Sequence, residues 1–270
     1  MLKGTHALAR RLRALKTDAA LRDAEGVIVA EGLHLAFDAL KANASIEAAV
    51  VSPRLAETEE GRELARLLSG AGVQAELASE AILDSLQDAR SPQPVVLIVK
   101  RPRLALNAVI AGAGKAQLVV VACGVQEPGN LGALWRTADA AGATGFVATT
   151  GSASLTHPRT VRASMGGVFR LGAAEAGIED VLDGVHGSRF RVIGAEARGA
   201  VAYDEVDWSG PFALLLGGEG AGLPAEVVRR LDVRVAIPMA PGVESLSVNA
   251  AAAVLLFAAA RARRTINRAG

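Results

Sequence analysis

The chain has little cysteine and few aromatic residues: one cysteine, Cys123, in 270 residues, and 3% Phe, Trp and Tyr. A single cysteine excludes an internal disulfide and any metal site built from several cysteines. We also find no His, Cys and carboxylate cluster with ligand spacing, so we expect no bound metal. The longest apolar run, 250–260, has 11 residues, whereas a membrane-spanning helix needs about 20. Charges at the N-terminus, where a secretory signal would be apolar, predict a cytoplasmic protein with no membrane partner.

An excess of charge of one sign is also missing. The 29 basic and 28 acidic residues leave a formal charge of +1, so the whole chain has no polyanion-binding signal. With 51% hydrophobic and 21% charged residues, the composition is that of a globular protein. Basic residues gather at the ends, in 1–22 and again after Glu244, where no acid follows. These ends could contact phosphate, or they could be the solvated faces of terminal helices.

Short β-branched runs alternate with helical patterns, which predicts an α/β fold with parallel βαβ units. A change of composition over 101–116, with a loop-like stretch at 110–115, predicts two domains, 1–105 and 106–270. In the first we expect strands at 27–30, 49–51, 73–77 and 95–99 and helices at 33–41, 61–69 and 80–86. In the second we expect strands at 118–123, 146–149, 190–193, 213–216 and 233–237 and helices at 130–141, 159–165 and 246–263.

Three unusual segments follow predicted strands, at 126–136, 216–224 and 237–249. In an open α/β sheet, ligands bind beyond the C-terminal ends of the strands. Each segment alone has an ordinary explanation, because Asn130 and Ser245 could cap helices and the glycines of the second segment could lie in turns. The second segment matches neither a Walker A sequence nor a dinucleotide fingerprint, so a phosphate cradle with a lysine is not expected.

Together, in order and spacing, the segments resemble the three motifs of the SpoU-type (TrmH-like) RNA ribose 2′-O-methyltransferases. The first, Asn-x-Gly-x-x-x-Arg-x-Ala, is matched by Asn130, Gly132, Arg136 and Ala138. The second, Gly-x-Glu-x-x-Gly-Leu, is matched by Gly217, Glu219, Gly222 and Leu223. The third, Ile-Pro-Met followed by Ser-Leu-Asn-Val-Ser, is matched by Ile237, Pro238, Met239, Ser245 and Leu246. The chain departs from the third motif at Ser247 and Asn249, where Asn and Ser have exchanged positions.

This resemblance covers about 117–265 and implies a trefoil-knotted (SPOUT-type) parallel-sheet methyltransferase domain that binds S-adenosylmethionine and works as a homodimer. The residues before the boundary resemble the smaller, ribosomal-protein-L30e-like α/β domain that binds the RNA substrate. The feature that carries this resemblance is Glu31-Gly32 after a predicted strand. The implied reaction is methylation of a ribose 2′-OH in RNA, with 23S ribosomal RNA preferred. The alternatives are a tRNA substrate, a catalytically inactive RNA-binding module of the same fold, and an unrelated enzyme that places 217–222 on a nucleotide phosphate.

The resemblance also implies roles for individual residues. Backbone and apolar groups around the cofactor would come from Gly217, Gly218, Ile237, Met239 and Leu246. The catalytic group would comprise Arg136, Asn130, Glu219 and Ser245. Arg136 would deprotonate the hydroxyl or stabilise the alkoxide. Deprotonation requires a neutral guanidine, which is rare at neutral pH, whereas stabilising the alkoxide requires only the charged form. The exchange at Ser247 and Asn249 puts in doubt any role that needs an amide at 247, which Asn249 would replace only in part.

Three further residues have plain interpretations. His157, without His, Asp or Glu partners at motif spacing, is predicted to be a surface or substrate contact rather than a base. Cys123 lies in an apolar run and is predicted to be a buried small hydrophobe. Trp135, although it precedes Arg136, is predicted to pack in the core rather than stack on a base.

Overall fold

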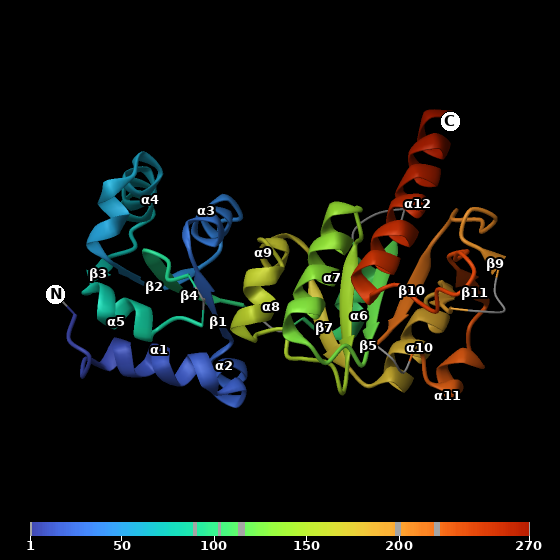
Figure 1. Ribbon diagram of the computed structural model, residues 1–270, viewed down its shortest axis with the longest axis horizontal. Helices are drawn as coiled ribbons and strands as arrows, with labels where there is room; N and C mark the ends of the chain where they lie inside the picture. The colour runs from blue at the N-terminus through green and yellow to red at the C-terminus, as the bar shows by residue number, and fades with distance from the viewer. Residues whose placement is uncertain are drawn as a thin grey trace. The chain divides into compact units, whose positions relative to one another are not determined.

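The computed structural model describes residues 2–88, 91–101, 104–112, 117–197, 201–218 and 222–269, with side chains up to residue 264. Contacts divide the chain into two compact units, each with its own sheet (Figure 1). Unit 1 comprises Met1–Arg103 and Thr156–Arg170, and unit 2 comprises Leu104–Leu155 and Leu171–Gly270. This division differs from the predicted domains mainly in the segment 156–170, which packs with unit 1.

Unit 1 is built on a mixed sheet with the strand order β1-β4-β2-β3. The strands are β1 (Val27–Glu31), β2 (Ile46–Val51), β3 (Ala75–Leu77) and β4 (Val95–Lys100). Because β4 runs antiparallel to both β1 and β2, the prediction of a parallel sheet is wrong here. Val51 pairs with both Leu77 and Val95, so β4 starts at the end of the sheet where β2 and β3 finish. The segment between β3 and β4 therefore does not recross the sheet, as a parallel connection must.

Helices surround this sheet and bury an apolar face against it. They are α1 (Ala7–Thr17), α2 (Ala19–Glu25), α3 (Leu33–Lys41), α4 (Glu59–Gly70), α5 (Glu80–Ser85), α8 (Pro158–Ala163) and α9 (Gly167–Arg170), with the 3₁₀ helix η1 (Pro53–Glu57). Two of the N-terminal basic residues form hydrogen bonds or ion pairs with other residues of unit 1. Arg22 is buried and donates to the Leu15 carbonyl at 2.6 Å, and Arg11 pairs with Glu25 at 2.6 Å. Burial lowers the pKa of Arg22 and removes its guanidinium from solvent. Arg22 therefore stabilises unit 1 and does not contact phosphate.

Unit 2 contains a seven-stranded parallel sheet with the order β7-β6-β5-β10-β8-β11-β9. Its strands are β5 (Leu118–Cys123), β6 (Gly145–Thr149), β7 (Ala173–Ala176), β8 (Arg191–Ala195), β9 (Val201–Ala202), β10 (Phe212–Gly217) and β11 (Val233–Ala236). Every residue of β5 is buried, as expected for a parallel strand covered on both faces. Although β10 and β11 come last in the chain, β10 lies between β5 and β8, and β11 lies between β8 and β9.

The helices of unit 2 cover both faces of this sheet. They are α6 (Leu106–Ala111), α7 (Pro128–Ala140), α10 (Ile178–Gly187), α11 (Ala225–Val228) and α12 (Val248–Ala269). Apolar residues of α6, α10 and α11 share one core with the strands, while α7 and α12 lie side by side (Figure 1). Ile110, predicted to be in a loop, is instead buried in α6, and 113–116 lie outside the described residues. No helix in the described ranges is both long and apolar enough to span a bilayer.

Candidate functional site

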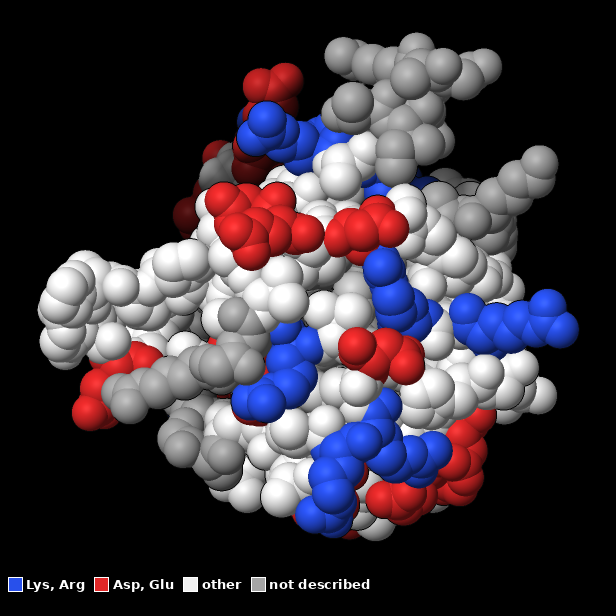
Figure 2. All heavy atoms as spheres, turned by 90° about the vertical axis from the view of Figure 1, so that its right-hand side faces the viewer, with Lys and Arg blue, Asp and Glu red and all other residues white. Residues whose placement is uncertain are grey.

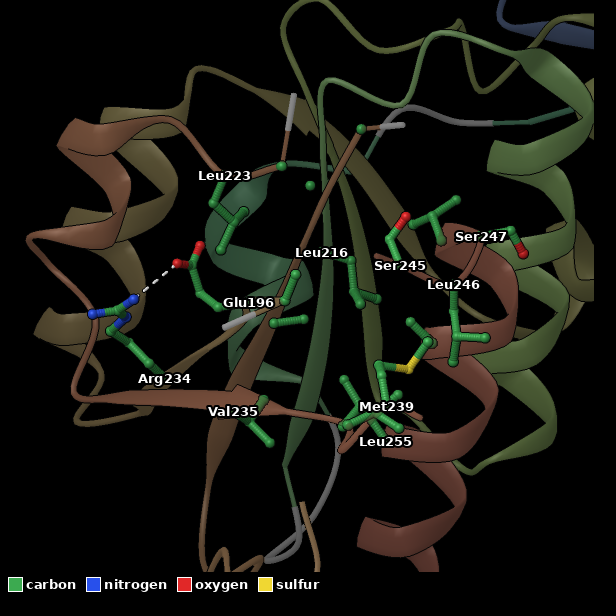
Figure 3. Close-up of a pocket in the computed structure, with 18 of the residues that line it drawn as sticks. Glu196, Leu216, Leu223, Arg234, Val235, Met239, Ser245, Leu246, Ser247 and Leu255 are labelled. Carbon is green, nitrogen blue, oxygen red and sulfur yellow. Dashed lines mark hydrogen bonds and ion pairs between the residues drawn. The ribbon is translucent and has the colours of Figure 1, made fainter. Parts of the chain in front are cut away.

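A cavity of about 890 Å³ opens in unit 2 beyond the C-terminal ends of β8, β10 and β11 (Figure 3). Apolar side chains form much of its wall, among them Leu216, Leu223, Val235, Met239 and Leu255. Polar side chains lie at its sides, namely Glu196, Arg234, Glu244, Ser245 and Ser247. The cavity lies within the size range of small-molecule sites, and its combination of apolar walls and a few polar groups is typical of them.

The second and third segments singled out in the sequence meet at this cavity. All five residues predicted to contact a cofactor line it: Gly217, Gly218, Ile237, Met239 and Leu246. Of the four predicted catalytic residues, Ser245 lines it as well. The parallel strands explain this meeting, because β10 and β11 both run to the same edge of the sheet, with β8 between them.

Glycine is required at 217 and 218 because other backbone packs against both positions. A methyl group on Gly217 would overlap the carbonyl group of Gly222 and would lie 2.7 Å from the Leu223 nitrogen. A methyl group on Gly218 would overlap the carbonyl oxygen of Gly124. Gly222 has a φ of +64°, a left-handed conformation that favours glycine. The motif glycines thus let the end of β10 pack directly against the backbone at 124 and 222–223, while Glu219 itself lies outside the described residues.

Asn130 lies inside α7 and does not cap it, contrary to the simplest interpretation of the sequence. The helix begins at Pro128, and the Glu127 carboxylate caps it by accepting a hydrogen bond from the Asn130 backbone N–H at 2.7 Å. The Asn130 side chain points elsewhere: its Oδ1 accepts a hydrogen bond from Nδ2 of Asn249, at 3.1 Å. This contact joins the first and third motifs.

Arg136 is exposed on α7 and is not among the residues that line the cavity. Within the parts of the chain that the structure describes, its side chain makes no hydrogen bond or ion pair. No hydrogen bond joins Arg136 to Ser245, and Glu219, the fourth predicted catalytic residue, lies outside the described residues. An exposed guanidinium that no neighbour holds is accessible to a large substrate.

The start of α12 differs from its prediction. The helix begins at Val248, two residues later than expected, and Ser247 caps it. The Ser247 Oγ accepts from the Ala250 N–H at 3.3 Å, and its carbonyl accepts from the Ala251 N–H at 3.0 Å. The alternative in which Ser245 caps this helix is therefore wrong. Ser245 and Leu246 instead precede the helix, exposed and facing the cavity (Figure 3).

Sequence reasoning missed one charged pair in the cavity wall. Arg234 Nη2 lies 3.1 Å from Glu196 Oε2, on the side of the cavity opposite Ser245 and Ser247 (Figure 3). Glu196 directly follows β8, and an acid at the C-terminal end of a parallel strand is a signal that could have found it. Arg234 lies inside β11, where a strand pattern gives no sign of a ligand-binding role.

The three plainly interpreted residues behave as structural groups. His157 Nδ1 accepts from the Arg159 N–H at 3.1 Å and caps α8. Burial raises the pKa of the Cys123 thiol to about 12, and its predicted role as a buried small hydrophobe is confirmed. Trp135 stacks on Phe146 with ring centroids 5.5 Å apart and donates from Nε1 to the Leu171 carbonyl, so its packing role is confirmed. Among the described side chains, no three His, Cys, Asp or Glu residues gather as metal ligands.

Charges of both signs are interspersed on the face shown in Figure 2. Ion pairs account for several of the exposed charges of unit 2: Arg230 lies 2.8 Å from Glu179 and 2.6 Å from Asp183. A nucleic-acid surface would need basic side chains without matching acids. The described residues of this face offer no such continuous surface.

Comparison with known proteins assigns both parts of the chain. Residues 117–257 match the SpoU rRNA Methylase family, and residues 8–97 match the MRM3-like substrate binding domain. The chain is 30% identical over 227 residues to the 23S rRNA (guanosine(2553)-2′-O)-methyltransferase RlmP of Bacillus subtilis, covering 84% of this chain and 86% of that one.

Solved structures agree over nearly the whole length. An AdoMet-bound rRNA methyltransferase from Sinorhizobium meliloti is 31% identical, with a TM-score of 0.84 and 97% of each chain covered. The SpoU methyltransferase AviRb from Streptomyces viridochromogenes, solved with AdoMet, is 27% identical, with a TM-score of 0.85 and coverage of 96% of this chain and 99% of that one. The resemblance read from the three motifs is confirmed, and the chain belongs to the SpoU rRNA methylase family of S-adenosylmethionine-dependent RNA ribose methyltransferases.

Proposed function

We propose that this protein transfers a methyl group from S-adenosylmethionine to a ribose 2′-OH of 23S ribosomal RNA. The observation that carries the proposal is the cavity beyond β8, β10 and β11, whose wall contains six of the predicted site residues. The relatives with named activities point the same way: RlmP is a 23S rRNA 2′-O-methyltransferase, and so is the uridine(2479) enzyme of Streptomyces viridochromogenes, 30% identical over 193 residues.

The cavity fits S-adenosylmethionine in size and in chemistry. Its apolar wall, with Leu216, Leu223 and Val235, suits an adenine ring, and Gly217 and Gly218 line it with backbone alone. The charged pair Glu196–Arg234 suits hydroxyl or amino acid groups. When bound, S-adenosylmethionine supplies an electrophilic methyl group on a positively charged sulfur. Gly217, Gly218, Ile237, Met239 and Leu246 would hold it.

The remaining chemistry belongs to the chain's own residues. The attacking 2′-OH must lose its proton near the transition state, and the negative charge that develops on its oxygen needs a cation or hydrogen-bond donors. Arg136 supplies that cation: its exposure on α7 leaves the guanidinium accessible to RNA. Asn130 and Ser245 would orient the substrate with their amide and hydroxyl groups, and Glu219 would orient Arg136.

The test is incubation with S-adenosylmethionine tritiated in its methyl group and RNA from cells that lack the modification, followed by separation of 23S rRNA, 16S rRNA and tRNA. We expect label in 23S rRNA alone. Label in tRNA alone would favour the tRNA alternative. Measurable S-adenosylmethionine binding without any label would favour an inactive RNA-binding module, and binding of ATP or NAD instead would contradict the family-based account.

The proposal includes a division of labour between residues 1–105, which would bind RNA, and 106–270, which would perform the transfer. Its support is the match of residues 8–97 to the MRM3-like substrate binding domain. Because 156–170 pack with unit 1, the test uses the full-length protein: cross-linking to 23S rRNA without S-adenosylmethionine should occur within 1–105, and cross-linking to S-adenosylmethionine should occur within 106–270. Because the proposed substrate is ribosomal RNA, we also propose a cytoplasmic location.

We further propose a homodimer and a trefoil-knotted chain in unit 2. Support for the dimer is the exposure of two large apolar side chains near the end of the chain, Val243 at 50% and Phe257 at 45%. Light scattering should give a mass near twice that of the 27.6 kDa chain. Support for the knot is the order of the sheet, in which β10 and β11 enter between earlier strands. When the chain is unfolded by pulling on its ends, its extended length should be shorter than that of an unknotted chain of 270 residues, because a tightened knot holds some of them.

A further inference from the structure

The exchange of Ser and Asn at 247 and 249 has a structural counterpart. At 247 the side chain caps α12, and Ser and Asn are about equally good at this position. Serine there therefore preserves the helix start. Asn249 is the second residue of the helix, and its amide reaches across to α7 instead of bonding to its own backbone.

The Asn249 amide contacts the first motif directly. Its Nδ2 donates to Oδ1 of Asn130 at 3.1 Å, which joins the first turns of α7 and α12. A serine at 249 would end one bond short of this nitrogen and would not make the same contact. Because Oδ1 of Asn130 is engaged, the Asn130 amino group is the end of that amide that faces away from Asn249.

Among the described residues, the amide at 249 leaves a buried oxygen without a hydrogen bond, a free-energy penalty that a serine, which lacks this oxygen, would not incur. Asn249 Oδ1 is buried and accepts no hydrogen bond from the described residues, which is unfavourable for a polar atom. The donor group of Asn249 is therefore the part of its side chain that makes a hydrogen bond, to Asn130. Asn249 is also not among the residues that line the cavity, so its contact with Asn130 is separate from cofactor binding.

We propose that Asn249 is a positioning residue that fixes the orientation of the Asn130 amide, so that this chain has moved to 249 the amide that the common motif places at 247. The inference rests on the proposed function, because it assumes that Asn130 acts in methyl transfer. It predicts that loss of the Asn249 donor lowers kcat and leaves the affinity for S-adenosylmethionine unchanged.

The test compares Asn249→Asp with Ala250→Asp in the full-length protein. Aspartate has the shape of asparagine but replaces the donor with an oxygen, which forces the Asn130 amide to turn over. An acid in the first turn favours a helix, so Asn249→Asp should not weaken α12. Ala250→Asp places the same charge on the next, exposed residue of the same helix and controls for repulsion of RNA. We expect kcat to fall on the order of 10- to 100-fold for Asn249→Asp and less than about 3-fold for Ala250→Asp.

A second comparison shows whether Asn249 acts through Asn130. If it does, Asn130→Ala/Asn249→Ser should be no slower than Asn130→Ala alone, because the two residues form one unit. Additive losses would overturn the proposal. So would an Asn249→Asp variant with wild-type kcat, a loss of equal size in Ala250→Asp, or a loss confined to S-adenosylmethionine affinity. If the wild-type protein binds S-adenosylmethionine but labels no RNA, the proposed function fails and this inference fails with it.

Discussion

Replacing Gly217 with alanine tests the close packing of the end of β10 against the backbone at 222–223. The added methyl group would overlap the Gly222 carbonyl and lie 2.7 Å from the Leu223 nitrogen, where ordinary contacts start at 3.4 Å. These neighbours are backbone atoms and cannot rotate away, so 222–223 must retreat by at least about 0.7 Å. Overpacking of this kind costs about 1–3 kcal/mol of stability. Both segments line the cavity, so we expect affinity for S-adenosylmethionine to fall roughly tenfold or more.

Calorimetric titration with S-adenosylmethionine and thermal unfolding are the assays for Gly217→Ala. The matched control is Gly187→Ala, at the exposed end of α10, where a methyl group would meet nothing within 4 Å. That variant should bind normally and unfold at the same temperature or slightly higher, because alanine favours helix. If Gly217→Ala bound S-adenosylmethionine as tightly as the wild type, the packing of Gly217 against 222–223 would not shape the cofactor site as we describe.

Other predictions concern separate parts of the molecule. Arg136→Lys should lower kcat on the order of 100-fold with little change in S-adenosylmethionine affinity, and a normal rate would remove Arg136 from the mechanism. Arg162→Met removes the partner 3.0 Å from the Glu31 carboxylate, whose side chain is 1% exposed. It should cost about 2–3 kcal/mol in urea unfolding at pH 7, less than for a fully buried pair because Arg162 is 35% exposed. Burial raises the pKa of Glu31, so this loss should shrink as the pH falls and the carboxyl is protonated; a loss independent of pH would contradict the argument. The thiol of Cys123, with a pKa of about 12 against 9.0 ordinarily, should resist Ellman's reagent in the native protein at pH 8 and react in denaturant. Because the native pKa is raised, stability relative to Cys123→Ala should fall as the pH rises from 9 towards 12, and equal pH profiles would contradict the burial argument.

Elements with a strong local pattern were predictable from the sequence. The bounds of β5 and α3 agree with the prediction at both ends. A run of six apolar residues with three consecutive valines identifies the first, and apolar spacing after Gly32 identifies the second. α10 was not predicted from the sequence, because Gly184 and Gly187 lower the helix propensity of this segment.

Strand direction and neighbours were not predictable in the same way. The residues of β1 and most of β4 are buried on both faces, so their patterns are alike whether the strands run parallel or antiparallel. The place of β10 between β5 and β8 depends on contacts between residues far apart in the chain. The motifs identified the cavity residues for a different reason: they follow strand ends, and parallel strands carry those ends to one edge.

The contacts between motifs needed the structure. Glu196 and Arg234 come together because β8 and β11 are neighbours in the sheet, which neither strand pattern reveals. Likewise, the sequence marks Asn249 as unusual, but only the packing of α12 against α7 gives it a partner in Asn130. Local signals therefore located the site, and non-local packing determined which side chains meet in it.

The most direct test of the central claim is a map of ribose methylation in 23S rRNA after reaction with the protein and S-adenosylmethionine. A 2′-O-methyl group blocks attack of the 2′-oxygen on the neighbouring phosphodiester, so the methylated position resists alkaline cleavage. We predict one new alkali-resistant linkage with the wild-type protein and none with Arg136→Lys at the same reaction time. Methyl label on a base, with every linkage still cleaved by alkali, would contradict the account.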